Sequence, residues 1–157
     1  MTDDLDKTRA YALRILGFRS HSVAEMQQKL LQRKLPESAI RQIVDELRNQ
    51  GYLNDRRFAQ ELVRSLIRRK AVGRYYILAK LRDHLIDSTI ANEILPREFP
   101  VEKEKELAQK AAARKAEEFE VKLNKLSRVQ KGRIIRFLNS RGFDNEVISE
   151  TVDSMAK

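Results

Sequence analysis

The chain contains no cysteine, and only three prolines and five glycines among its 157 residues. Without cysteine there is no disulfide framework, no thiolate nucleophile and no zinc finger. So few glycines cannot build a phosphate-cradling loop or a dinucleotide fingerprint. No Asn-Gly or Asp-Gly pair occurs either, so the usual local signal of a β-hairpin is missing.

Long apolar runs and ligand-like spacings are also missing. No stretch approaches 18 apolar residues and the first residues are acidic, so we expect no transmembrane helix, no signal peptide and a cytoplasmic location. His21 and His84 lie 63 residues apart, which fits no metal-ligand spacing. Neighbouring carboxylates such as Asp45 and Glu46 point in different directions on a helix, which makes them poor acid/base partners. We therefore expect no enzyme, no cofactor and no metal.

What the sequence does contain is helical periodicity. Phe58, Leu62 and Leu66 follow i, i+4, i+8 spacing, which fills one helix face. The segment from Ser22 to Glu25 has the residue types of a capping box at a helix N-terminus. The fold class predicted is all-α, with helices near 5–17, 22–34, 36–50, 55–70, 72–84, 87–95, 101–120, 128–141 and 144–156. Pro96 and Pro100 are expected to bracket a short connection.

The apolar pattern repeats along the chain. Leu30, Leu35, Ile40, Val44 and Leu47 are echoed at the same intervals by Leu138, Phe143, Ile148, Val152 and Met155, with a fainter echo between them. Repeats of about 50 residues bury their apolar faces against neighbouring repeats and form elongated arrays. The pattern favours three tandem three-helix repeats over 1–51, 52–98 and 99–157 in one continuous structural unit. The alternative is an ordinary bundle of similar helices.

The formal charge of +9 is unevenly distributed. Residues 56–82 hold nine basic side chains and one acid, and residues 121–143 hold seven basic side chains and no acid. On a helix over 55–70, Arg57, Arg64 and Arg68 fall on one stripe opposite the apolar face. An unneutralised row of this kind repels itself unless an anion meets it, either a nucleic-acid backbone or an acidic protein groove. The alternative is a solvated charged face.

Tyr75 and Tyr76 have the flat rings that stack on unpaired bases, although one tyrosine of such a pair usually packs in the core. The helix that would read a DNA groove lacks the polar side chains that recognise base edges. Non-specific contact with a nucleic-acid backbone is therefore favoured over sequence-specific recognition of bases.

The run Gly51-Tyr52-Leu53-Asn54-Asp55-Arg56-Arg57-Phe58-Ala59 is similar to the central signature of the RecX family of regulatory proteins. Ala12 to Leu30 is similar to the opening repeat of this family, and Lys131 to Phe143 to its closing repeat. The chain departs from the family pattern in the middle unit, with Tyr76 in place of Arg, Lys80 in place of Glu and Leu85 in place of Gly.

The resemblance implies a monomeric modulator of the RecA recombinase that lodges in the groove of its filament on single-stranded DNA. Such a protein would limit filament growth, ATP hydrolysis, strand exchange and the co-protease role in the DNA-damage (SOS) response. The alternative is a protein that coats single-stranded nucleic acid without RecA. The residues expected to meet the anionic partner are Arg57, Arg64, Arg68, Arg69, Lys70, Arg74, Lys80, Arg82, Lys131, Arg133 and Arg136.

Overall fold

The computed structural model describes residues 2–120 and 122–155, and within these residues the chain is all-helical. The helices fall where the periodicity predicts them, although the end expected at residue 156 lies outside the described residues. Their bounds are α1 Thr2–Phe18, α2 Val23–Gln32, α3 Glu37–Asn49, α4 Asp55–Arg69, α5 Arg74–Asp83, α6 Ser88–Glu98, α7 Val101–Ala116, α8 Arg128–Ser140 and α9 Asn145–Met155, with 3-10 turns at Glu117–Phe119 and Leu123–Lys125.

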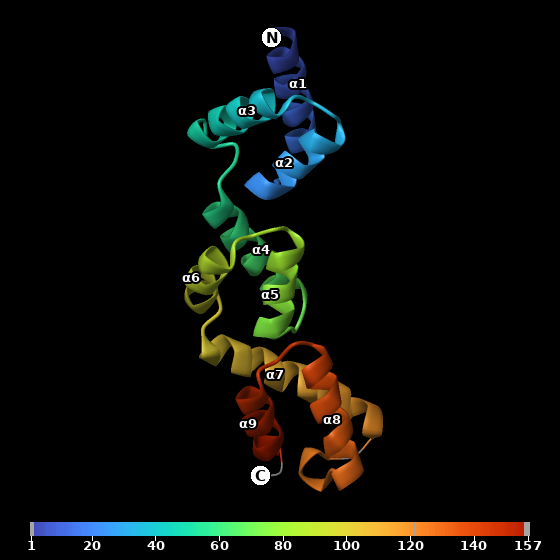
Figure 1. Cartoon of the computed structure of the whole chain (residues 1–157). Helices are drawn as coiled ribbons and strands as arrows, with labels where there is room; N and C mark the ends of the chain where they lie inside the picture. The colour runs from blue at the N-terminus through green and yellow to red at the C-terminus, as the bar shows by residue number, and fades with distance from the viewer. Residues whose placement is uncertain (1, 121, 156–157) are drawn as a thin grey trace.

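The helices pack in three groups, α1–α3, α4–α6 and α7–α9, because each helix makes its main contacts with the two others of its group. The groups follow one another along an elongated molecule, with the two chain termini at opposite ends (Figure 1). No helix within the described ranges is long and apolar enough to cross a membrane.

In each group the second helix ends in the same kind of turn. The residue two positions beyond that helix adopts a left-handed backbone, with φ of 60° at Lys34, 59° at Leu85 and 81° at Gly142. After α5 and α8 the next amide donates back to the helix, from Ile86 to Leu81 and from Phe143 to Leu138. This is the hydrogen bond of a Schellman motif, which satisfies carbonyl groups that a helix C-terminus leaves free.

The first junction, between α1–α3 and α4–α6, is mainly polar. The capping box at Ser22 is confirmed, and its Glu25 also accepts from Arg19 at 2.9 Å and from His84 Nδ1 at 3.2 Å. Ser22 Oγ donates to the His84 carbonyl at 2.6 Å, and Asp55 accepts from the Val23 amide at 2.9 Å. Side chains of α1–α3 form a separate apolar core, which includes Met26, Leu30, Ile43 and Leu47.

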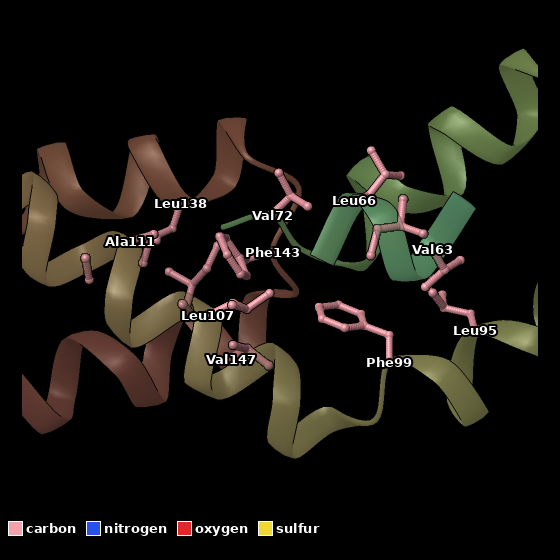
Figure 2. Close-up of a cluster of buried hydrophobic side chains, with 14 of the residues drawn as sticks. Val63, Leu66, Val72, Leu95, Phe99, Leu107, Ala111, Leu138, Phe143 and Val147 are labelled. Atoms are coloured by element: carbon pink, nitrogen blue, oxygen red, sulfur yellow. The ribbon is translucent and has the colours of Figure 1, made fainter. Parts of the chain in front are cut away.

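The second junction, between α4–α6 and α7–α9, is continuous and apolar. One cluster of buried side chains runs through both groups, with Phe99 and Val72 from one group meeting Phe143 and Leu107 from the other (Figure 2). The backbones also touch, because Tyr75 N donates to the Gly142 carbonyl at 2.9 Å. A Cβ atom on Gly73 would lie 2.3 Å from Phe143 Cα, so only glycine fits at this contact.

Glu104 is the polar centre of the second junction. Its carboxylate is 0% exposed and accepts from the Arg74 amide at 3.0 Å, from Arg74 Nε at 2.8 Å and from the Asp144 amide at 3.1 Å. It therefore caps the N-terminus of α5 and the start of α9 together. A negative charge at a helix N-terminus is stabilised by the helix dipole.

One local prediction is wrong. Helix α6 continues through Pro96 to Glu98, because this proline lies in the last turn, where it costs the helix one hydrogen bond.

His21 lies in the loop before the capping Ser22 and is only 3% exposed. Its ring is enclosed because Nδ1 donates to the Arg19 carbonyl and Nε2 accepts from Lys29.

Candidate anion-binding cleft

The row of arginines on α4 agrees only in part with the sequence prediction. Arg64 is neutralised, because it forms two hydrogen bonds with Glu98 of α6, at 2.7 and 2.9 Å. Those bonds raise the pKa of Arg64 above its ordinary value. Arg57 donates to the Gly51 carbonyl, in the connection between α3 and α4. Arg68 is exposed and forms no ion pair within the described part of the chain.

Arg74 belongs to the second junction rather than to an open basic surface. Burial lowers the pKa of Arg74, but the hydrogen bond and charge of Glu104 raise it, so that the net pKa lies above the ordinary value. Glu104 therefore pairs with the Nε of Arg74 inside the molecule, and contact of Arg74 with an external anion stays a prediction.

Lys70 and Lys80 flank the same aromatic ring. Their ammonium nitrogens lie 5.6 Å and 5.4 Å from the centroid of Tyr76, within the range of a cation–π contact. Lys70 Nζ also donates to the Tyr76 hydroxyl at 3.2 Å. Tyr76 is partly buried against the core and Tyr75 is exposed, so only Tyr75 of the pair presents a free ring.

A cleft brings the end of α4 together with α7, and we call it the α4–α7 cleft. Its volume is about 360 Å³ and its floor is apolar, formed in part by Ile67, Ala71 and Leu107. Its polar walls are Arg68, Arg69 and Lys70 on one side and Lys103, Lys110 and Arg114 on the other. Among the described residues, the ion pairs that these six cations form all go to one carboxylate, Glu106, which lies 3.5 Å from Lys103 and 3.2 Å from Lys110.

The three cations on α7 are functional candidates that the sequence argument missed. Lys103, Lys110 and Arg114 are spaced i, i+7, i+11, which places them on one helix face. The segment 101–120 has more acids than basic residues, so its net charge conceals this row. The helical position of each charge, rather than the net charge of the segment, is the signal that would have found it.

The remaining candidates are not brought into this cleft. Arg82 is exposed near the end of α5, and Arg133 and Arg136 are exposed on α8. Lys131 is half-buried on the same helix. None of these four lines the α4–α7 cleft. The structure therefore divides the predicted basic surface into one cleft, one set of internally bonded arginines, Lys80 and Arg82 on α5, and a separate group on α8.

The chemistry of the α4–α7 cleft is that of an anion receptor. Excess positive charge in a concave surface with an apolar floor focuses the electrostatic field and attracts a polyanion or an acidic protein surface. The long side chains of Arg68, Arg69 and Arg114 reach a partner of either kind, and guanidinium groups bind carboxylates and phosphates in a bidentate manner.

Comparison with known proteins identifies the family. The family model for the first three-helix domain of RecX matches residues 9–47, and that for the second three-helix domain matches residues 54–95. The chain belongs to the RecX family. The regulatory protein RecX of Pelodictyon phaeoclathratiforme is 34% identical over 143 residues, covering 90% of this chain and 84% of the relative. That of Chlorobium phaeobacteroides is 34% identical over 154 residues, covering 97% of both chains.

Solved RecX structures have the same fold. The crystal structure of RecX from Lactobacillus salivarius superposes with a TM-score of 0.90 at 22% identity, covering 99% of this chain and 98% of that one. A second RecX crystal structure gives a TM-score of 0.82 at 24% identity, covering 97% and 73%. The family relatives are named as regulatory proteins, so this RecX chain has a regulatory role.

Proposed function

We propose that this RecX protein binds the RecA recombinase filament on single-stranded DNA, in the cytoplasm, and inhibits its growth, ATP hydrolysis, strand exchange and co-protease activities. The observation that carries the proposal is the α4–α7 cleft, where six cations from two helix groups converge on one concave surface. Family membership supports a regulatory role, and the charge of the cleft supports an anionic partner surface.

The shape of the molecule also supports this function. An elongated series of helix groups has the length to lie along a filament groove and touch successive protomers (Figure 1). In this proposal α7–α9 is a third copy of the three-helix unit, which extends the repeats over 1–51, 52–98 and 99–157. Arg133 and Arg136 of α8 then extend the contact beyond the cleft. Charge complementarity at such a surface accelerates encounter and fixes register.

The test is RecA ATP hydrolysis on single-stranded DNA, titrated with this protein. We expect hydrolysis to fall at protein concentrations well below that of RecA, while binding to bare DNA stays weak. Arg69→Glu combined with Arg114→Glu reverses two charges on opposite walls of the cleft and should abolish inhibition. Arg41→Glu, an exposed reversal on α3 outside the cleft, is the matched control and should inhibit like the wild type.

The second candidate function is coating of single-stranded nucleic acid without RecA, which the same cationic cleft favours. This candidate predicts inhibition only when the protein saturates the DNA. It also predicts a steep salt dependence, with a slope near −0.7 per phosphate neutralised. If hydrolysis falls only at DNA-saturating protein, or if the cleft reversals inhibit as well as the wild type, the RecA-specific function is refuted.

A further inference from the structure

A second cleft lies in the first helix group, away from every residue of the predicted basic surface. It opens between α1 and α2 and has a volume of about 620 Å³. We call it the α1–α2 cleft, and its side chains important here are Tyr11, Arg14, Phe18, Lys29 and Arg33.

The wall formed by α1 combines aromatic rings with a cation. Tyr11, Arg14 and Phe18 are spaced i, i+3, i+7, so they share one face of the helix. Phe18 is 81% exposed, the most exposed large apolar side chain of the described residues. Arg14 is also exposed and forms no ion pair with any described residue. An open ring therefore lies one helical turn from an open guanidinium.

The wall formed by α2 supplies two more cations in fixed positions. The guanidinium carbon of Arg33 lies 4.3 Å from the centroid of the Tyr11 ring, which orients it across the cleft. Lys29 Nζ donates to His21 Nε2 at 2.8 Å. Burial lowers the pKa of His21, which keeps the ring neutral and its Nε2 an acceptor. Lys29 therefore has an oriented ammonium group with donors left for a ligand.

Among the described residues, no carboxylate lines the α1–α2 cleft to neutralise these cations. The acid of the capping box, Glu25, is occupied by Arg19 and by His84 at the first junction. Arg14, Lys29 and Arg33 thus form a set of three cations around an exposed phenylalanine. Such a set attracts an anion, and the ring offers a face to a flat or apolar partner.

The ligand class that supplies both is a single-stranded nucleic acid. Proteins that bind single strands combine a cationic groove for phosphates with aromatic rings on which bases stack. An acidic peptide engages the cations but presents no π-face beside each anion. We propose that the α1–α2 cleft binds single-stranded nucleic acid, with a base stacked on Phe18 and phosphates held by Arg14, Lys29 and Arg33.

The stacking contact is tested with a fluorescein-labelled oligothymidylate and an abasic strand of the same length, by fluorescence anisotropy with the full chain. Phe18→Ala should weaken oligothymidylate binding about tenfold and leave abasic binding unchanged. Leu31→Ala, at a side chain 50% exposed in the same helix group but outside the cleft, is the control and should bind like the wild type. Repeating these measurements with each variant combined with Arg69→Glu and Arg114→Glu removes any contribution of the α4–α7 cleft.

The phosphate contacts are tested by salt dependence. Arg14→Ala should reduce the slope of log K against log salt by about 0.7, because one phosphate contact is lost. Phe18→Ala should leave the slope unchanged, and so should Arg41→Ala on α3. Circular dichroism verifies that each variant remains helical.

Three results would overturn the proposal. The first is oligothymidylate binding that Phe18→Ala leaves intact, and the second is an equal loss on the abasic strand. The third is an oligoglutamate peptide that binds with the same dependence on Phe18, which would assign the cleft to acidic protein segments. Neither measurement contains RecA, so the result is independent of the proposed filament function.

Discussion

Two buried carboxylates join the three helix groups, and their surroundings differ. Glu25, at the first junction, has Arg19, Ser22 and His84 as partners, and the apolar cores on its two sides are separate. Glu104, at the second junction, is enclosed completely beside a core that runs through both groups. The first junction is therefore held by hydrogen bonds near the surface, and the second by packing around a buried ion pair.

This difference predicts which helices unfold together. Cooperative unfolding requires a common apolar core, and α4–α6 and α7–α9 have one, whereas the core of α1–α3 is separate. We therefore expect α4–α9 to unfold as one unit and α1–α3 to unfold separately. Hydrogen exchange should report two distinct opening free energies, one for each side of the first junction.

The largest effect is expected from Gly142→Ala at the second junction. A Cβ atom there would lie 2.3 Å from the Tyr76 amide nitrogen, in a residue whose φ is +81°. The Tyr76 backbone cannot easily move away from this contact. We therefore expect a loss of roughly 3–5 kcal/mol in the free energy of unfolding of α4–α9. Denaturant titration measures the loss, and hydrogen exchange should show α1–α3 unchanged.

Gly17→Ala is the matched control for this variant. Nothing lies within 4 Å of a Cβ atom on Gly17, which is in α1, so alanine should be neutral or stabilising by up to about 1 kcal/mol. Equal stability of Gly142→Ala and the wild type would show that the second junction is as adaptable as the first.

The next largest effect is expected from Glu104→Gln. Breaking a buried ion pair leaves Arg74 uncompensated, which typically costs about 3–5 kcal/mol. Combining it with Arg74→Met removes the stranded charge and should recover part of the loss, which a double-mutant cycle measures. Glu102→Gln, at an exposed position on the same helix, should have almost no effect. A loss no greater than that of Glu102→Gln would mean that the ion pair does not hold the junction.

The stability of the first junction should depend on pH. Burial raises the pKa of Glu25, but hydrogen bonds from Arg19, Ser22 and His84 lower it more, to about 2 from the ordinary value of 4.5. Because the folded pKa is the lower one, the charge stabilises the fold above pH 4.5 and loses this effect as pH falls toward 2. The contribution is up to about 3 kcal/mol at neutral pH.

Acid titration of the wild type and Glu25→Gln measures this contribution. The stability difference between them should be largest near neutrality and shrink as the pH approaches 2, and hydrogen exchange should locate it at α1–α3. A difference that is constant across this pH range would rule out ionisation of Glu25 as the source of the stability.

Much of the fold was predictable because it is local. Apolar spacing such as Phe58, Leu62 and Leu66 encodes a helix without help from distant residues, and the capping box at Ser22 encodes its own start. The junctions were not predictable in this way. Glu104 and Arg74 are 30 residues apart, and nothing in their local sequence distinguishes this pair from ordinary surface charges.

The candidate site was predictable only in part, for the same reason. The row of arginines on α4 was found from sequence, but its pairing of Arg64 with Glu98 depends on how α6 packs. The α7 wall of the α4–α7 cleft was missed because Lys103 stands between Glu102 and Glu104, and because the acids of 101–120 outnumber its basic residues. Which predicted cations contact the partner stays a prediction until the cleft reversals are measured.

The smallest effect concerns a departure from the family pattern at the first junction. Leu85 stands where glycine is usual, and it adopts the left-handed conformation all the same, with φ of 59° and a side chain 43% exposed. This conformation costs a residue with a Cβ atom about 1 kcal/mol or more. Leu85→Gly relieves that strain but increases the freedom of the unfolded chain, so we expect a net stabilisation below about 1 kcal/mol. Leu85→Ala removes the same side chain without relieving the strain, and it should be less stable than Leu85→Gly by thermal denaturation. The opposite order would mean that the backbone at His84 and Leu85 is not strained, and that the first junction tolerates the substitution at no cost.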